Sequence, residues 1–209
     1  MDTKLTEQES MKIINEMILQ ARNNVQKGSA NSMIYNGYVI AFIAILHFIL
    51  FNVLTGTDLK WAGLVWCLMI PSFFIDYYIK KRVDRSGFVK THVDGILSTL
   101  GAGMTISVAV LLPIFFSFAF IFNTDSFFIV IAPTVLTMIA SLELVTAKVY
   151  RFKPFFWGAV AFWSGALLCG LSFIVLKRLD IQFLILAICM ILGFVIPGYK
   201  LNKSAKDNV

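Results

Sequence analysis

Six long apolar stretches alternate with short polar segments along this chain of 209 residues. Each stretch is close to the ~20 apolar residues that a helix needs to cross a hydrocarbon core of ~30 Å. The pattern therefore predicts an all-α membrane protein, built as a bundle of six transmembrane helices. The predicted spans are residues 34–54, 61–79, 96–122, 127–147, 156–176 and 181–198.

The predicted spans divide the chain into three regions. These are an amphipathic cytoplasmic helix (1–33), a six-helix transmembrane domain (34–200) and a cytoplasmic tail (201–209). Hairpins of two spans recur about every 60 residues, and Met69-Ile70-Pro71 resembles Val195-Ile196-Pro197. The spacing fits three tandem helical hairpins, but any six-span protein with short outer loops would show it.

The basic residues indicate the orientation in the membrane. Fifteen of the 18 Lys and Arg residues fall in the N-terminal segment, the second and fourth loops and the tail, which all lie on one side. Basic loops stay in the cytoplasm. All six Tyr residues fall at the same ends of the spans, where their rings favour the headgroup zone. We therefore expect a multi-pass protein of the bacterial inner membrane with both termini cytoplasmic.

Composition narrows the function classes. The chain is 58% hydrophobic and 14% charged, whereas soluble domains are about 25% charged. The net charge of +6 then reflects topology, and we expect no nucleic-acid partner because no soluble domain would present a basic face. The sequence contains no GxSxG, HExxH or Walker A motif. We therefore expect no enzyme activity and no cofactor, although a membrane enzyme acting on a lipid or quinone remains an alternative.

The segment before the first span is predicted to form an amphipathic helix over residues 6–28, with Gly28 and Asn31 as stop signals. Its apolar positions follow helical spacing, and those expected to dock are Met11, Ile14, Met17, Ile18 and Val25. The segment through Asn31 holds as many acids as bases, whereas a helix bound to anionic lipid is normally base-rich. This balance favours docking on protein, either the bundle's own cytoplasmic face, a second copy or a partner. A helix lying at the membrane interface is the alternative.

Two acidic residues fall inside predicted spans, where burial of a charge is costly. Counted from the outer ends of their spans, Asp76 and Glu143 lie at a similar depth near the cytoplasmic end. Asn36, Ser98 and Thr99 lie slightly closer to that end. A polar vestibule there would hold a cation or relay protons. Alternatively, both acids extend to the interface, where Lys80 and Lys148 are one turn away.

A second set of residues shares a depth near the outer face. It consists of His47, Cys67, Cys169 and Cys189, on four different spans. Cys and His are the usual ligands of a tetrahedral soft-metal site. No spacing motif supports such a site, and buried Cys commonly acts as a small apolar residue. We therefore expect no metal and keep these four residues only as the remote alternative.

The start of the chain follows the pattern E-S-x-x-(I/L)-I-x-x-M-I-x-x-A and continues to Gly with an aromatic residue at the start of the first span. The positions that carry this pattern are Glu9, Ser10, Ile13, Ile14, Met17, Ile18, Ala21, Gly37 and Tyr38. Together with residues 196–202 at the other end, they resemble a group of small polytopic membrane proteins of Bacteroidota, which pairs such a short cytoplasmic helix with such a first span. Asn36-Gly37-Tyr38 replaces the group's Trp-Gly. The resemblance implies six helices and an inner-membrane location, and it implies no activity.

Two functions remain open. The first is a non-enzymatic inner-membrane protein with an accessory, scaffolding or sensing role through its N-terminal helix. The second is a small-solute or ion transporter that uses Asp76 and Glu143 at a cytoplasmic vestibule. Four prolines lie within or near the ends of the spans: Pro71, Pro113, Pro133 and Pro197. Proline tends to kink a helix, and such kinks would allow the gating motion of a transporter, although they are also ordinary in membrane helices.

Overall fold

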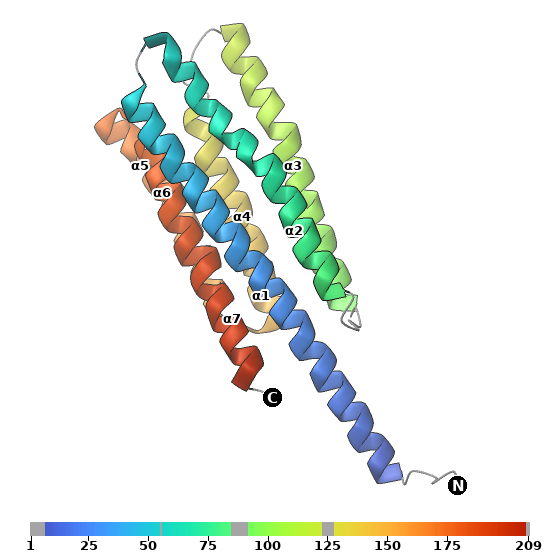
Figure 1. Cartoon of the computed structure of the whole chain (residues 1–209). Coiled ribbons are helices and arrows are strands. Elements are labelled where there is room, and N and C mark those ends of the chain that lie inside the picture. The colour runs from blue at the N-terminus through green and yellow to red at the C-terminus, as the bar shows by residue number, and fades with distance from the viewer. Residues whose placement is uncertain (1–6, 55, 85–91, 123–127, 208–209) are drawn as a thin grey trace.

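The computed structural model describes residues 7–54, 56–84, 92–122 and 128–207, and these form helices with no strand among them (Figure 1). The elements are α1 (Glu7–Val53), the 3₁₀ segment η1 (Gly56–Leu68), α2 (Met69–Asp84), α3 (His92–Phe122), α4 (Phe128–Tyr150), α5 (Lys153–Leu176), α6 (Ile181–Met190), the π segment η3 (Ile191–Val195) and α7 (Ile196–Asp207). Six helical stretches are long and apolar enough to cross a membrane. The predicted all-α, six-helix fold is confirmed.

The first helix is longer than the sequence indicates. α1 is continuous from Glu7 to Val53, so the stop predicted at Gly28 and Asn31 is wrong. A glycine inside a helix costs only about 1 kcal/mol relative to alanine, and packing outweighs that cost. Two residues after Gly28, Ala30 is fully buried and its carbonyl oxygen lies against Gly198 of α7. This contact holds the chain helical where local signals favour an end.

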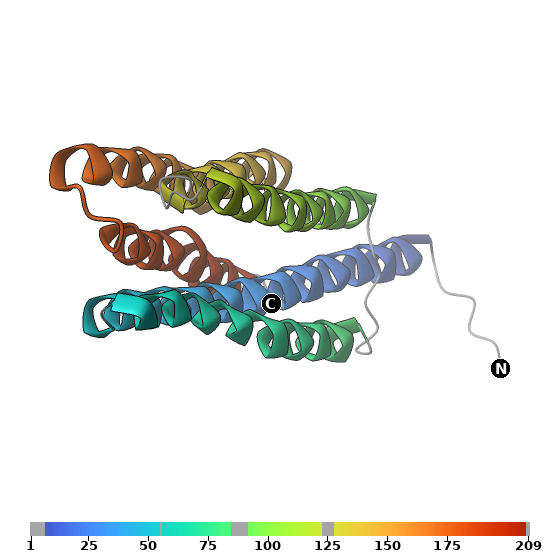
Figure 2. The same ribbon diagram turned by 90° about the horizontal axis from the view of Figure 1, so that it is seen from above.

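The helices form two layers joined by the C-terminal span. α3, α4 and α5 lie in one layer, and α1 and α2 lie in the other (Figure 2). Among the residues that the structure describes, the backbones of α1 and α4 make no close contact, whereas the span α6–η3–α7 packs on α1 and also on α5. The largest apolar core lies around this span, with Leu136, Phe162 and Met190 at its centre. The C-terminal span therefore connects the two layers.

Close crossings of this span depend on small residues. A Cβ added at Gly158 of α5 would lie 2.9 Å from the carbonyl oxygen of Gly193 in η3. A Cβ at Gly37 of α1 would lie 2.7 Å from a methyl carbon of Val195. Membrane helices associate through such close backbone approaches because lipid provides no hydrophobic drive between them. These glycines let the last span lie tightly against helices of both layers.

Helix type changes at the two tripeptides that resemble each other in sequence. Met69-Ile70-Pro71 begins α2 directly after η1, and Ile196-Pro197 begins α7 directly after η3. Proline lacks an N–H, so it cannot complete the i→i−4 bond of a regular helix. The π segment takes up the irregularity, and the Ile196 N–H donates to the carbonyl oxygen of Ile191. Pro113 and Pro133 lie inside α3 and α4 without such a change.

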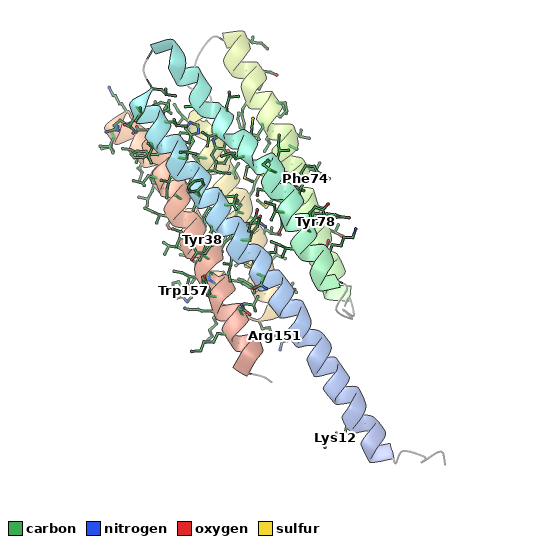
Figure 3. All side chains as sticks on the ribbon, in the orientation of Figure 1. Lys12, Tyr38, Phe74, Tyr78, Arg151 and Trp157 are labelled. Atoms are coloured by element: carbon green, nitrogen blue, oxygen red, sulfur yellow. The ribbon has the colours of Figure 1, made fainter. Side chains whose placement is uncertain are left out.

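Most of the outward surface is apolar, as a bilayer environment requires. Tyr38, Phe74, Tyr78 and Trp157 are all exposed on the outside of the bundle (Figure 3). Large exposed apolar patches are rare on soluble monomers. The two termini lie at the same end of the bundle (Figure 1), as an even number of spans demands.

Candidate functional site

One buried polar group in the described part of the bundle is the carboxyl group of Glu143 on α4. Its side chain is 3% exposed, although the residue lies only seven positions, or about 10 Å, before the end of the helix. The atom Oε2 is buried without a hydrogen-bond partner. Glu143 therefore points into the protein, and the alternative that it extends to the interface is not what the structure shows.

The surroundings of Glu143 explain its burial. The carboxyl oxygen Oε2 lies 3.6 Å from the Cβ position of Gly158, directly behind the crossing of α5 with η3. Both backbones approach closely there because Gly158 and Gly193 have no side chain. π segments inside helices are frequent at functional sites. The site therefore combines a buried carboxyl group, whose oxygen Oε2 has no hydrogen-bond partner, with an irregular, glycine-rich helix crossing.

Asp76 belongs to a different cluster. The Ser32 hydroxyl of α1 donates a hydrogen bond of 2.7 Å to its carboxylate oxygen Oδ1. The Asn36 amide donates to the Ser32 hydroxyl over 3.3 Å. Ser32 is buried, and Asp76 and Asn36 are partly buried. This chain of polar groups fastens α2 to α1 within one layer.

The predicted vestibule is therefore divided. α2 carries Asp76 and packs on α1 and η1, whereas α4 carries Glu143 and packs on α3, α5 and α6. Ser98 and Thr99 lie exposed on α3, and the Thr99 hydroxyl donates to the carbonyl oxygen of Gly95 in its own helix. Of the five predicted residues, Asp76 and Asn36 join one hydrogen-bonded cluster through Ser32. Equal depth along six helices does not place side chains on the same face.

The four residues of the alternative metal site, His47, Cys67, Cys169 and Cys189, lie in different surroundings. The Trp66 indole N–H donates a hydrogen bond of 2.7 Å to Nδ1 of His47. The His47 ring stacks on Phe183 at a centroid distance of 3.8 Å. Cys67 is exposed, while Cys169 and Cys189 are buried. Within the described ranges, no group of three or more His, Cys, Asp or Glu side chains is placed to hold a metal ion. His47 instead joins α1 to η1 and α6.

A polar cluster that sequence reasoning missed lies at the end of the bundle opposite the termini. Asp180, in the turn between α5 and α6, is 2% exposed and accepts hydrogen bonds from Arg178 and from the Asn52 amide of α1. Arg178 also donates to the Asn52 side-chain oxygen over 3.1 Å. Burial alone would raise the pKa of Asp180, but the hydrogen bonds and charge of Arg178, with the Asn52 bond, bring that pKa below its usual value.

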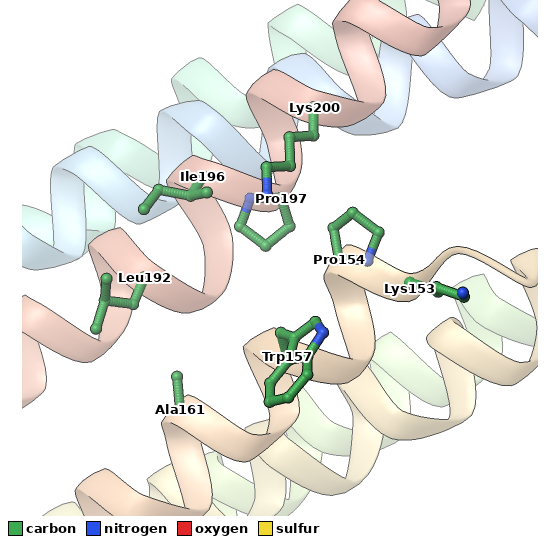
Figure 4. A pocket seen from close by; sticks show the side chains of 8 residues that line it. All are labelled: Lys153, Pro154, Trp157, Ala161, Leu192, Ile196, Pro197 and Lys200. Carbon is green, nitrogen blue, oxygen red and sulfur yellow. The ribbon is translucent and has the colours of Figure 1, made fainter.

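A groove opens on the outside of the bundle between α5 and the last span (Figure 4). Its volume is about 420 Å³. The lining residues are Lys153, Pro154, Trp157 and Ala161 of α5, Leu192 of η3, and Ile196, Pro197 and Lys200 of α7. The groove lies beside the Gly158–Gly193 crossing, because Trp157 and Leu192 directly precede those glycines.

The predicted docking helix is the N-terminal part of α1. The N-terminal part of its backbone projects beyond the rest of the bundle, past the end of α7 (Figure 1), so that part does not lie on the bundle itself. Met11 is 63% exposed. The side chains of Ile14, Met17, Ile18 and Val25 lie outside the part of the chain that the structure describes. We refer to residues 7–29 of α1 as the arm.

Sequence reasoning missed the glycines at the crossings. The pairs of small residues that stand out in the sequence of the fifth span, at four-residue spacing, are Ala161 with Gly165 and Ala166 with Gly170. Gly165 does lie at a close contact with the Cys189 side chain, whereas no side chain or neighbouring backbone lies within 4 Å of a Cβ at Gly170. Neither Gly158 nor Gly193 has another small residue four positions away that would mark it in the sequence. Their role in the close crossing is seen only when the two helices are packed together.

Comparison with known proteins supplies no relative. No protein-family model, no curated protein and no solved structure matches this chain. The six apolar helices establish a polytopic membrane protein. Its role must therefore be argued from its own residues.

Proposed function

We propose that this protein is a non-enzymatic accessory or scaffolding component of the bacterial inner membrane, which presents its arm to a partner protein in the cytoplasm. One observation carries the proposal: α1 leaves the membrane as an unbroken helix and projects beyond the bundle. The arm's 23 residues extend about 35 Å at 1.5 Å per residue. Because the arm continues the first span as one helix, the packing of that span in the bundle sets the direction of the arm.

The arm's sequence supports recognition by protein. Met11, Ile14, Ile18, Ala21 and Val25 recur at three- and four-residue intervals and share one face of the helix. An amphipathic helix of this kind fits an apolar groove on a partner. Its acids and bases balance, which disfavours attraction to an anionic lipid surface. The resemblance to the membrane proteins of Bacteroidota supports the inner-membrane location.

The test compares two charge-matched pairs of substitutions on the arm. Ile14→Asp with Ile18→Asp places two acids on the apolar face, and Gln20→Asp with Asn23→Asp places two on the opposite face. Native mass spectrometry of full-length protein, gently extracted from its own membrane, measures the assembly. We expect a stoichiometric complex with a second protein that is lost only in the first pair.

Two outcomes would overturn this function. One is a wild-type protein that is found without any protein partner. The other is a complex that survives both pairs of substitutions unchanged. A homo-oligomer lost only in the first pair would overturn the partner protein and identify a second copy as the occupant of the arm.

A second candidate function, transport of protons or small ions, is favoured by Glu143 alone. A buried carboxyl group without a partner is costly in a membrane, and such groups often mark ion pathways. The test is proton flux into proteoliposomes, followed by an internal pH-sensitive dye. Transport predicts that Glu143→Gln abolishes the flux while Asp76→Asn, in the other layer, retains it. Equal rates in wild type, Glu143→Gln and empty liposomes would reject transport.

A further inference from the structure

The groove between α5 and the last span is bordered by charge at one end only. α5 and η3–α7 run antiparallel, so Lys153 and Lys200 lie together at one end, and Ala161 and Leu192 lie together at the other. Eight residues separate the two ends on each helix, which is about 12 Å of rise. Both lysines are exposed, at the limits of the apolar spans that begin at Lys153 and end at Ser204.

The rest of the groove is apolar and open toward the lipid. Trp157 is 67% exposed, and Leu192 and Ile196 are exposed as well. Pro154 of α5 and Pro197 of α7 face each other across the opening (Figure 4). Neither ring offers an N–H, and Ala161 at the deep end has the smallest side chain of the lining residues. A molecule bound in the groove would therefore contact apolar side chains along most of its length and the ammonium groups of Lys153 and Lys200 at one end.

We propose that this groove binds one anionic phospholipid. The phosphate lies between the ammonium groups of Lys153 and Lys200, Trp157 lies at the level of the headgroup and glycerol, and one acyl chain runs along Ala161 and Leu192. Charge complementarity selects this occupant, because basic pockets between membrane helices on the side rich in Lys and Arg suit anionic headgroups. Indole rings favour the same depth. A zwitterionic lipid would leave the two lysines without a net counter-charge.

The position of the groove gives the lipid a structural consequence. Its floor borders the Gly158–Gly193 crossing, through which the last span joins the two layers. A lipid seated there contacts α5 and the last span at once. Binding is therefore expected to raise the thermal stability of the whole bundle, since a ligand that binds only the folded state stabilises it.

The experiment is native mass spectrometry of full-length protein in detergent, titrated separately with phosphatidylglycerol and phosphatidylcholine. The test variant is Lys153→Gln with Lys200→Gln. The matched control is Lys148→Gln with Lys203→Gln, which removes two exposed lysines near the same end that do not line the groove. Each lysine near an anionic lipid is expected to contribute about fivefold in affinity, so the test pair should lose about thirtyfold for phosphatidylglycerol. The control pair should change little.

A steric variant checks the position of the acyl chain. Ala161→Leu should fill the deep end and weaken both lipids without removing the preference for phosphatidylglycerol. Three results would overturn the proposal: equal affinity of wild type for the two lipids, loss of preference in the control pair as large as in the test pair, or protein dimers that Ala161→Leu dissociates. Complete displacement of phosphatidylglycerol by millimolar inorganic phosphate would likewise overturn the proposal, because it would identify a free anion as the ligand.

Discussion

At the scale of single residues, Glu143 is the side chain whose chemistry the fold restricts most. Its oxygen Oε2 has no partner, so an uncharged side chain of the same size should fit equally well. We predict that Glu143→Gln leaves the free energy of unfolding within about 1 kcal/mol of wild type, whereas Glu143→Lys lowers it by about 3–5 kcal/mol. Thermal unfolding in detergent measures both. A strong loss in Glu143→Gln would show that the charge has a partner in the fold.

Asp180 differs from Glu143 because its carboxylate is paired with Arg178. We predict that Asp180→Asn lowers the free energy of unfolding by about 1–3 kcal/mol, since Arg178 and Asn52 lose a charged acceptor. The matched control is Asn52→Ser, which removes the bond from α1 and retains the ion pair, and it should cost less. Thermal unfolding at pH 7 ranks the three proteins, and equal melting temperatures would contradict the role of the cluster.

The lowered pKa of Asp180 also sets a pH dependence. A carboxyl group whose pKa is lower in the folded state contributes stability above its unfolded value of about 3.9. That contribution is lost as the pH falls through the lower pKa of the folded state. Between pH 7 and about pH 2, wild type should therefore lose more stability than Asp180→Asn. Parallel pH profiles of the melting temperatures of the two proteins would disprove this.

At the scale of elements, the crossing of α5 with η3 should tolerate no side chain at Gly158. A Cβ there would lie 2.9 Å from the Gly193 carbonyl oxygen, so Gly158→Ala must separate the backbones. We predict a loss of about 1–3 kcal/mol in the free energy of unfolding. Gly170→Ala on the same helix has open space and should be neutral or gain up to about 1 kcal/mol. Equal effects of the two substitutions on thermal unfolding would contradict the tight crossing.

At the scale of the whole molecule, the six spans require both ends of the chain to lie on one side of the membrane. We predict that cysteines introduced at Lys12 and Lys203 resist a membrane-impermeant maleimide in intact spheroplasts, whereas a cysteine at Lys177 reacts. Cys67→Ser, Cys169→Ala and Cys189→Ala would provide the background without native thiols. Opened membranes should expose all three positions. Labelling at Lys12 or Lys203 before opening would reverse the orientation that the basic residues indicate.

The sequence by itself determined the class of the fold and the number of apolar spans. These features depend on local properties: a run of apolar residues must be helical in lipid, because every backbone N–H and C=O needs a partner within the segment. The same reasoning found Glu143 and Asp76, since an acid inside an apolar run stands out in any sequence. It misplaced the end of the first helix because the burial of Ala30 against Gly198 outweighs the local stop signals.

Only the tertiary structure decided which faces meet. It separated Asp76 from Glu143, joined His47 to Trp66, and placed Gly158 against Gly193. It also paired Lys153 with Lys200 at one groove, although they are 47 positions apart in the chain. The physical reason is that depth in the membrane follows from counting residues along a span, at 1.5 Å each. Rotation and neighbours follow from side-chain packing between helices, which distant parts of the sequence determine together.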